Sequence, residues 1–520
     1  MNTTRPWTDA LFVELRRAFS LPNDRLFAAV LVLAVVPLWI SRYPPGVDMA
    51  QHAAQVASMH EIWAGNEMFT RVFEINWFTP YLLGYALLYG LSLIMPLAIA
   101  AQLLLSIALI LMPVLTGRLL AVAGADERWK WLAIPASFSL AFYWGFLTFM
   151  LAVPLGLYFL IAAIRFSRVP SVRGGITIAV FGTFLFFCHM IALCFVSLLA
   201  LGYVCSAGWR NLRTLALKMV PFTAPLPLIV TWLLLTYHRE GPAQHSPTLW
   251  APLYTRAVML LMQLAGLDVF WTILLVPVVG ALLLLPRLGG SRLSRRPERW
   301  VPFLIGLAAY FTLPSTWLNT GFIFDRLGVF LVPLWLMLWD PPATAGSRRV
   351  EWAAILVPIV WTLANTTRFA AFGKETEPFR AVLAQMEPGR TVAAMMADPY
   401  SPLFGEPVYM HFPGWYQVTG HGIVDFNFGD FYVQPVRYRR DAGPRMNEHL
   451  AWYPFAFRWD ADGGDRYDYF IIKSNADVSN AIFKERRASV ELVAHQDWWW
   501  LYRNIERPWP QRKAANAASR

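Results

Sequence analysis

Asp48 and His52 are the side chains best placed for acid–base chemistry near the start of the chain, and they lie four residues apart. Residues at this spacing share one face of a helix. Pro44 and Pro45 disfavour a helix up to that point, so we expect a helix from Asp48 to about Trp63. A carboxylate and an imidazole on one face can together accept and return a proton, as a general base must.

Both residues also have simpler interpretations. Asp is a favoured N-cap residue, and after Pro-Pro-Gly the Asp48 carboxylate can accept hydrogen bonds from free amides of the first turn. His52 can be an ordinary histidine at a membrane interface. Polar side chains (Asp48, His52, Gln55) and apolar ones (Met49, Ala53, Val56) fall on different sides of the predicted helix. This amphipathic pattern predicts a helix lying on a membrane surface.

The composition is that of a polytopic α-helical membrane protein. Of the 520 residues, 57% are hydrophobic and only 15% are charged. The mean hydropathy of +0.43 and the long apolar blocks are outside the range of ordinary soluble domains. The net charge of +11 comes largely from short loops between apolar blocks, so we do not interpret it as a nucleic-acid-binding face.

The apolar blocks predict about eleven transmembrane helices within residues 26–367. They are expected near 26–42, 96–117, 131–147, 149–165, 173–188, 190–208, 217–236, 268–286, 300–315, 327–340 and 350–367. With the N-terminus inside, the inner segments carry 20 Lys and Arg residues and the outer loops carry 5. This bias predicts a cytoplasmic N-terminus, residues 1–25, which is retained because no small-residue cleavage pattern follows the first apolar run.

The segment 79–95 is apolar enough for a further span, but that span would invert the charge bias. Tyr81, Tyr85 and Tyr89 recur every four residues and predict an aromatic stripe on a helix lying in the membrane interface. We therefore assign 79–95 to a large first outer loop, residues 43–95.

Residues 373–520 are more polar, and we expect them to form a small extracytoplasmic α/β domain. Four apolar runs are short enough for strands: 391–397, 467–473, 490–495 and 498–503. A helix is expected near 377–386. The three cysteines, Cys188, Cys194 and Cys205, lie in one apolar region and provide neither a disulfide framework nor a cysteine metal motif.

This layout resembles the GT-C superfamily of integral-membrane glycosyltransferases. The resemblance rests on DMAQH at 48–52, FTPYLL at 78–83 and FYWGF at 142–146, together with the order of spans, outer loop and C-terminal domain. It is similar to the branch that includes aminoarabinose and protein-mannose transferases, which use polyprenyl-phosphate sugars. The paired acidic motif of the protein-mannose type is absent, because no second acidic residue follows Asp48.

The resemblance implies transfer of a sugar from a polyprenyl-phosphate donor to an envelope glycan, lipid or protein, outside the bacterial cytoplasmic (inner) membrane. Asp48 would be the base and His52 its orienting neighbour. The leaving phosphate needs a cation, and Arg326, at the outer mouth of the tenth span, has the planar guanidinium that fits it. Arg326 can alternatively pair with Asp325 and anchor a helix end.

Five further residues have both a functional and a structural interpretation. His189 interrupts an apolar run between two spans and can reach the outer cavity or pack between helices. His238 and Arg239 can contact the donor or remain solvated in a loop. Tyr143 and Trp144, like the run 498–500 (WWW), can stack on sugars or belong to interface belts and packed cores.

No metal motif is recognisable, since Asp425, Asp430, His411 and His421 are scattered without ligand spacing. A divalent cation bridging Asp48 and phosphate is compatible with the sequence but not implied by it. Two other functions stay open: a transporter or lipid flippase, and a non-catalytic assembly protein with the same fold. The clustering of polar residues at one face, without visible repeats, favours surface chemistry over alternating access.

Overall fold

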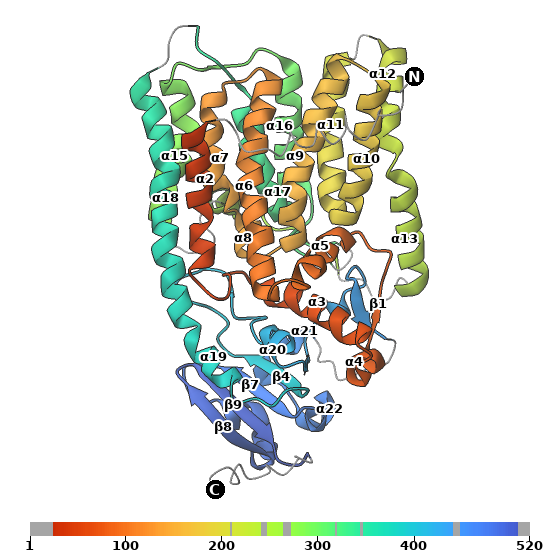
Figure 1. Ribbon diagram of the computed structural model, residues 1–520, viewed down its shortest axis with the longest axis vertical. Coiled ribbons are helices and arrows are strands. Elements are labelled where there is room, and N and C mark those ends of the chain that lie inside the picture. The colour runs from red at the N-terminus through yellow and green to blue at the C-terminus, as the bar shows by residue number, and fades with distance from the viewer. Residues whose placement is uncertain are drawn as a thin grey trace, which may run out of the picture.

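The computed structural model describes residues 24–208, 211–240, 247–263, 272–317, 320–343, 347–439, 442 and 448–507. A bundle of long apolar helices occupies one half of the molecule, and short helices with a five-stranded sheet occupy the other (Figure 1). The predicted N-terminal segment 1–25 lies almost entirely outside the described residues, as do residues 508–520 of the predicted C-terminal domain.

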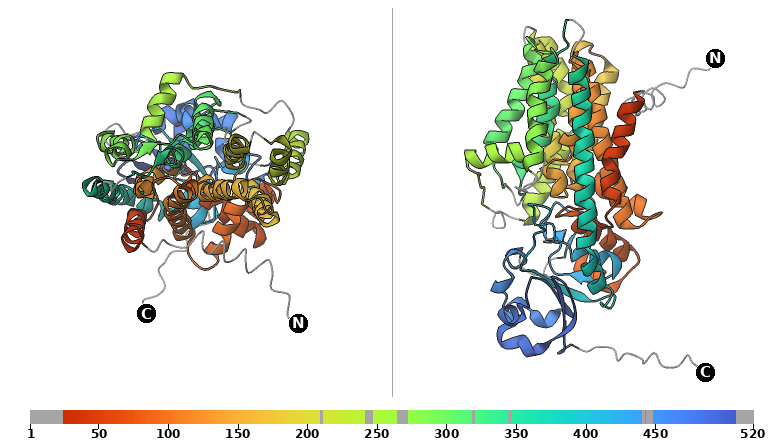
Figure 2. Two further views of the ribbon diagram at one scale, coloured as in Figure 1. Left: turned by 90° about the horizontal axis from the view of Figure 1, so that it is seen from above. Right: turned by 90° about the vertical axis from the view of Figure 1, so that its left-hand side faces the viewer.

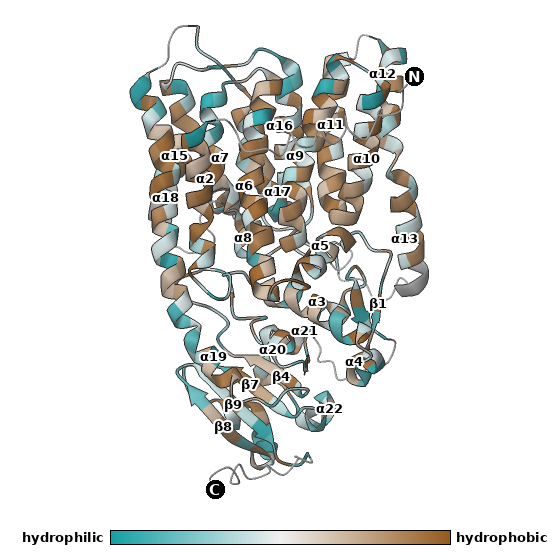
Figure 3. Ribbon diagram, viewed as in Figure 1, coloured by the Kyte–Doolittle hydropathy of each residue, from teal (hydrophilic) through white to brown (hydrophobic). Residues whose placement is uncertain are grey.

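Within the described ranges, the bundle contains eleven longer helical segments and two short helices. The longer ones are α2 (Arg25–Val35), α6 (Leu97–Ala123), α9 (Leu147–Arg168), α10 (Val172–Cys188), α11 (Met190–Gly208), α12 (Leu212–Met219), α13 (Leu226–Glu240), α15 (Thr272–Leu288), α16 (Pro297–Thr312), α17 (Ile323–Leu336) and α18 (Arg348–Glu375). The short ones are α7 (Ala133–Ser137) and α8 (Leu140–Tyr143). Apolar residues cover the middle of the bundle, and polar residues gather at its two ends (Figure 3).

Four helical segments among the described residues are long and apolar enough to cross a membrane, and a pair bent by 48° makes a fifth. The four are α6, α9, α11 and the stretch Arg348–Leu383, and the bent pair is Leu212–Thr223 with Leu226–Thr236. The remaining helices are shorter. The chain is therefore a helix-rich protein with several membrane-spanning helices, and the number eleven stays a prediction.

The predicted span 131–147 is not one helix, which corrects the sequence interpretation. A 3₁₀ helix ends at Leu132, α7 ends at Ser137, and Ser139 is extended before α8. The Ser137 hydroxyl donates to the Ile134 carbonyl over 2.6 Å and so competes with the helical ladder. The interruption bends the chain into a buried tip between Phe142 and Leu147 instead of letting it continue as a span.

Three helices of the predicted first outer loop lie at the end of the bundle that faces the sheet (Figure 1): α3 (Met49–Trp63), α4 (Glu67–Val72) and α5 (Leu82–Ser92). The expected helix after Asp48 is present. Its expected surface position is wrong, because every residue of α3 from Met49 to Met59 is buried. Its polar side chains bond to the C-terminal part of the chain: Gln51 Nε2 donates to the Phe426 carbonyl and Gln55 Oε1 accepts from Val436 N, both over 2.9 Å.

The tyrosines of the predicted stripe pack against α3, Tyr85 fully buried and Tyr89 in part. Tyr85 is 1% exposed and its ring lies 5.4 Å from that of His52, while Tyr89 stacks on His60 at 4.3 Å. A periodic stripe of rings with polar tips suits a polar protein interior as well as a membrane interface, and only the packed fold distinguishes the two.

The C-terminal sheet has the strand order β5-β4-β7-β9-β8. Strands β5, β4 and β7 are parallel, and β9 runs antiparallel to both of its neighbours, β7 and β8. Its strands are β4 (Thr391–Met396), β5 (Ile423–Val424), β7 (Tyr469–Lys473), β8 (Val490–Gln496) and β9 (Trp499–Asn504). Four of them begin within two residues of the predicted strands. Two short antiparallel pairs complete the strands. Three residues pair β1 (Phe73–Ile75) with β6 (Val436–Tyr438), and two residues pair β2 (Arg292–Leu293) with β3 (Trp339–Asp340).

Five short helices accompany the sheet: α19 (Glu377–Leu383), α20 (Gly414–Thr419), α21 (Glu448–Trp452), α22 (Trp459–Asp462) and α23 (Ser479–Phe483). One more, α14 (Leu253–Met262), lies beside the bundle. Helix α18 runs along the bundle and continues beyond it toward the sheet (Figure 2, right). The bundle and the sheet therefore meet through a continuous helix and through α3.

Strand β4 joins the two halves through its alternating side chains. Val392, Ala394 and Met396 belong to the large core that extends through the bundle. Ala393 and Met395 belong to a smaller core on the other face of the sheet. Successive side chains of a strand point to opposite faces, so one strand can serve both cores. The half of the molecule formed by the described residues from α19 to 507, here called the C-terminal half, is therefore packed onto the predicted outer loop as part of the same core. It is not attached by a linker alone.

Candidate active site

A cavity of about 470 Å³ lies where α3, the tip before α9, the start of α17 and the C-terminal half meet. It brings together four of the predicted site residues, Asp48, His52, Arg326 and Trp144. Its other lining residues are Tyr81, Phe146, Thr148, Thr316, Thr320, Gly321, Phe322, His411, Phe426, Phe428, Asp430, Phe431, Val433, Gln434 and Trp452. The wall thus combines aromatic side chains with about as many polar or charged ones, which can fix the orientation of a ligand.

Asp48 occupies the N-cap position of α3, but its carboxylate makes no capping hydrogen bond. The side chain turns into the cavity, where Oδ1 lies 3.6 Å from Nε2 of His411, and the residue is 7% exposed. The simpler interpretation of Asp48 as a helix cap therefore does not describe this structure. The carboxylate remains available for chemistry in the cavity.

The backbone around Asp48 is held by a close approach of two glycines. Gly145 has φ +82°, and a Cβ there would lie 3.0 Å from Asp48 N and 3.1 Å from the Gly46 carbonyl carbon. A side chain on Gly46 would in turn lie 3.0 Å from Gly145 Cα. The contact permits a hydrogen bond from Asp48 N to the Trp144 carbonyl over 2.9 Å. Glycine suits both the positive φ and the close backbone contact.

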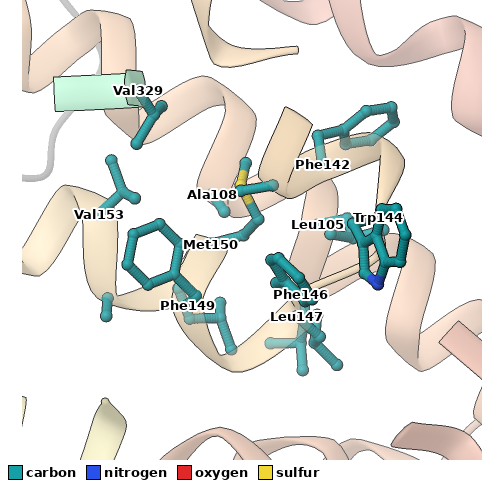
Figure 4. Packing of buried hydrophobic residues seen from close by; sticks show 14 of the residues in the cluster. Leu105, Ala108, Phe142, Trp144, Phe146, Leu147, Phe149, Met150, Val153 and Val329 are labelled. Atoms are coloured by element: carbon teal, nitrogen blue, oxygen red, sulfur yellow. The ribbon is translucent and has the colours of Figure 1, made fainter. Parts of the chain in front are cut away.

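The tip that carries Gly145 is itself fixed by apolar packing. Figure 4 shows Phe142, Phe146 and Leu147 around the turn, with Leu105 of α6 beside them. Phe142, Phe146 and Leu147 are all at most 5% exposed. Because the tip is packed on several sides, the position of Asp48 depends on the bundle core as well as on α3.

His52 is oriented by a hydrogen-bonded chain of buried groups. Its Nδ1 lies 2.7 Å from the Tyr85 hydroxyl, which donates to Gln434 Oε1 over 2.7 Å. Since the hydroxyl proton is committed to Gln434, His52 Nδ1 is the protonated nitrogen that donates to Tyr85. The other ring nitrogen, Nε2, makes no hydrogen bond of normal geometry to a side chain, and the Gly145 carbonyl interacts with the ring. His52 is therefore held between the Tyr85–Gln434 pair and the tip that carries Gly145.

Arg326 lies in the first turn of α17, where its guanidinium packs over the Phe146 ring at 3.8 Å from the ring centroid. Its Nη1 lies 3.2 Å from His189 Nε2, at the junction of α10 and α11. His189 is 1% exposed and its ring lies 4.7 Å from that of Tyr81. His189 thus stands behind Arg326 and is not part of the cavity wall.

Burial disfavours charge on the three groups that could exchange protons. It raises the pKa of Asp48 to about 8, against the opposing effect of the Arg326 charge. It lowers the pKa of His52 and of His411 to about 3, and Arg326 lowers that of His52 further. Desolvation penalises whichever form is charged, so acid and imidazole shift in opposite directions. At neutral pH the cavity therefore contains neutral imidazoles beside an aspartate that ionises within about a unit of that pH.

The other predicted residues have different positions. Trp144 lines the cavity, with its ring 4.0 Å from Phe322. Tyr143 is 0% exposed and does not line the cavity; its hydroxyl donates to Asn365 over 3.2 Å. The backbone of His238 and Arg239 ends α13, but their side chains lie outside the described part of the structure.

The contributions from the C-terminal half were not predicted from the sequence. His411, Gln434 and the phenylalanines of 426–431 were not recognised as site residues, although they form one wall of the cavity. The one local signal was the density of His, Asp and Phe between 411 and 431, which lacked metal spacing. Among the described residues, no three His, Cys, Asp or Glu side chains gather closely enough to hold a metal ion.

Comparisons with known proteins support the fold. No protein-family model matches the chain. No curated protein matches it by sequence. Solved structures of ArnT from Cupriavidus metallidurans do match, at 11% identity and TM-score 0.55 with undecaprenyl phosphate bound, and at 12% and 0.56 in the apo state. The matches cover 92% and 94% of this chain and 97% and 98% of those chains. At such identity the likeness concerns the fold, and the chain therefore has a GT-C-like fold over nearly its whole length.

Proposed function

We propose that this protein is a membrane glycosyltransferase that moves a sugar from a polyprenyl-phosphate carrier to an acceptor. The observation that carries the proposal is that Asp48, His52 and Arg326 converge on one cavity between the helical bundle and the C-terminal half. A solved structure of similar fold was determined with undecaprenyl phosphate bound, which supports a carrier of that class.

In the proposed reaction, an acceptor hydroxyl or amine attacks the anomeric carbon of the donor sugar. Its proton passes to Asp48, the new bond forms to the anomeric carbon, and the bond from that carbon to the phosphate oxygen breaks. The carrier phosphate leaves with the electron pair. Arg326 stabilises the growing negative charge on its oxygens, because a guanidinium offers parallel N–H donors to phosphate.

Asp48 is the base of choice over His52. A general base works best when its pKa lies near the operating pH, and burial brings the pKa of Asp48 to about 8. His52, whose pKa burial lowers to about 3, is the weaker base, and we assign it the orientation of the acceptor as a neutral imidazole. The aromatic lining excludes water and holds the sugar, which limits hydrolysis of the donor.

We further propose that the C-terminal half and the cavity lie outside the bacterial cytoplasmic membrane. The loops rich in Lys and Arg are at the end of the bundle opposite the sheet (Figure 1), and such loops remain cytoplasmic. The acceptor would then be an envelope glycan, lipid or protein, and a lipid-linked donor would supply the sugar without a nucleotide.

Native mass spectrometry of the detergent-purified protein tests the phosphate site. We expect a polyprenyl phosphate, or its glycosylated form, to co-purify with the wild type and to be lost in Arg326→Ala. Arg71→Ala is the matched control, because Arg71 is exposed and paired with Glu67 in the same outer loop. Bulk phospholipid alone in all three proteins would contradict the proposal and would direct attention to transport.

A further inference from the structure

The backbone that carries Arg326 needs support of its own. Phe146 and His189 contact the Arg326 side chain, and neither contact fixes the start of α17. Helix α17 begins after Phe322, which has a φ of +56°. A residue other than glycine keeps such a φ only where the surrounding structure holds it. The position of Arg326 therefore depends on contacts made to the first turn of α17.

Residues 247–263, which include α14, supply such contacts, and we call them the α14 segment. Its N-terminal end pairs with the chain that precedes α17. Leu249 N donates to the Thr316 carbonyl over 3.1 Å, and the Leu249 carbonyl accepts from Ser315 N over 2.7 Å. The Ser315 carbonyl in turn accepts over 3.1 Å from the N–H of Ile323, the first residue of α17. Backbone hydrogen bonds thus tie the start of α17 to the α14 segment.

Arg256 of α14 joins the end of α16 to the start of α17 from a buried position, 1% exposed. The last turn of α16 lacks a donor, because Pro314 has no N–H to give to the Tyr310 carbonyl. Arg256 Nη1 replaces it and donates to the carbonyls of Tyr310 and Leu313 over 2.9 and 2.7 Å. The guanidinium also lies 4.2 Å from the ring centroid of Phe324, in the first turn of α17. One side chain therefore connects three helices.

Gln263, at the C-cap of α14, holds the peptide group next to Arg326. Its Nε2 donates over 3.0 Å to the Asp325 carbonyl, which belongs to the peptide bond between Asp325 and Arg326. The Gln263 side chain is 3% exposed and packs tightly on α17, since a Cβ on Gly328 would lie 2.6 Å from Gln263 Cδ. Neither Gln263 nor Arg256 lines the cavity around Asp48. Their route to a ligand there is the position of Arg326.

We propose that Arg256 and Gln263 are positioning residues for Arg326, and that the α14 segment sets where its guanidinium meets the carrier phosphate. This inference deepens the proposed transferase and rests on it for the role of Arg326. A group that binds a reacting phosphate must be held within about 0.5 Å, which requires supporting contacts behind it. Helix capping alone is the competing explanation for Arg256, and it predicts lost stability without a specific effect on Arg326.

The test compares Gln263→Met and Arg256→Lys with two matched variants of the full-length protein in nanodiscs. Gln263→Met keeps the length of the side chain and removes its N–H donor. Arg256→Lys keeps the charge and removes the planar set of donors. The controls are Gln102→Met and Arg299→Lys: Gln102 and Arg299 are 4% and 1% exposed and also donate to backbone carbonyls of the bundle. Arg299 lies in the first turn of α16, whereas Arg256 contacts its last turn.

Hydrogen–deuterium exchange reports on the start of α17 without donor or turnover. We expect faster exchange at residues 323–329 in both α14 variants, and wild-type exchange there in both controls. Native mass spectrometry should show loss of most polyprenyl phosphate from the α14 variants only. Their kcat/KM for transfer should fall by about 10–100-fold, because a small misplacement of a binding group is costly. The pH midpoint of kcat/KM should also rise, since a displaced Arg326 lowers the pKa of Asp48 less.

Thermal unfolding verifies that each variant is folded, and Gln263→Met carries the test if Arg256→Lys does not fold. Wild-type exchange at the start of α17 in Gln263→Met overturns the proposal. When the wild type retains polyprenyl phosphate, equal retention by the α14 variants, or equal loss from the controls, also overturns it. A wild type that retains no polyprenyl phosphate removes the proposed transferase instead. Faster exchange confined to the α14 variants would then still support the positioning of Arg326.

Discussion

His411 Nε2 lies 3.6 Å from Asp48 Oδ1, although the two residues come from the C-terminal and N-terminal parts of the chain. Both side chains are buried, and the His411 ring stacks on Phe426 at 5.0 Å between ring centroids. The segment 43–95 supplies the carboxylate, and the C-terminal half supplies the group that faces it. The candidate site is therefore complete only when the two halves are packed together.

Replacing His411 with glutamine should lower kcat by about 10–100-fold, because a misplaced base loses much of its advantage even when it is present. Retention of the carrier lipid should be unchanged, since Arg326 is untouched. His421→Gln is the matched control: His421 pairs with Glu61 over 2.7 Å, and its side chain is 62% exposed. Equal transfer rates in the two variants would exclude a positioning role for His411.

The pH dependence of kcat/KM should follow the ionisation of Asp48 in the free protein. Burial raises the pKa of Asp48 to about 8, so transfer should rise with pH and reach half its plateau near pH 8. Arg326 lowers that pKa, and its loss in Arg326→Gln should move the midpoint upward. Arg326→Lys keeps the positive charge and should leave the midpoint near the wild-type value. A midpoint at the ordinary aspartate pKa of about 4 would contradict the assignment of Asp48.

Gly145→Ala should lower both stability and transfer. A non-glycine residue at positive φ costs about 1–3 kcal/mol, and here a Cβ also meets Asp48 N at 3.0 Å. Gly65→Ala is a control for the strain alone, because Gly65 has φ +75° and a Cβ there would meet no atom within 4 Å. Chemical denaturation and transfer assays should show the larger loss for Gly145→Ala. Similar losses for the two would show that the glycine contact does not position Asp48.

Tyr85→Phe should affect the orientation of His52 more than overall packing. The variant leaves the His52 Nδ1 proton without its acceptor, which costs about 1–3 kcal/mol of stability in a buried site. Tyr89→Phe is the control, since Tyr89 is on the same helix and stacks on His60. Transfer should fall in Tyr85→Phe and persist in Tyr89→Phe. Unchanged stability and transfer in Tyr85→Phe would contradict the hydrogen-bonded chain.

Local sequence rules predicted much of the secondary structure. The prolines before Asp48 correctly mark the start of α3, and short β-rich runs mark β4, β7, β8 and β9. The apolar run 131–147 predicts one regular span, whereas the backbone departs from a helix at Ser137 and again at Gly145. Hydropathy reports the burial of side chains and not the path of the backbone.

The sequence predicted the site residues of the helical bundle and of α3, but not those of the C-terminal half. Asp48 and His52 were found because helical spacing is a local property, and Arg326 because a charge near an apolar span is conspicuous. His411 faces Asp48 at the start of α3, and Gln434 accepts from Tyr85 of α5; no spacing rule encodes these contacts. Other long-range contacts explain why α3 is buried, since its glutamines bond to the C-terminal backbone instead of to water.

The most direct test of the central claim is native mass spectrometry of Asp48→Asn beside the wild type, both expressed in cells that make the donor. If Asp48 is the base, the variant binds donor but cannot discharge it. We expect the glycosylated polyprenyl phosphate to accumulate on Asp48→Asn, with transfer reduced by about 10²–10⁴-fold. Asp460→Asn, which changes an exposed carboxylate outside the cavity, should behave as the wild type. Wild-type turnover by Asp48→Asn, with no trapped donor, would contradict the account.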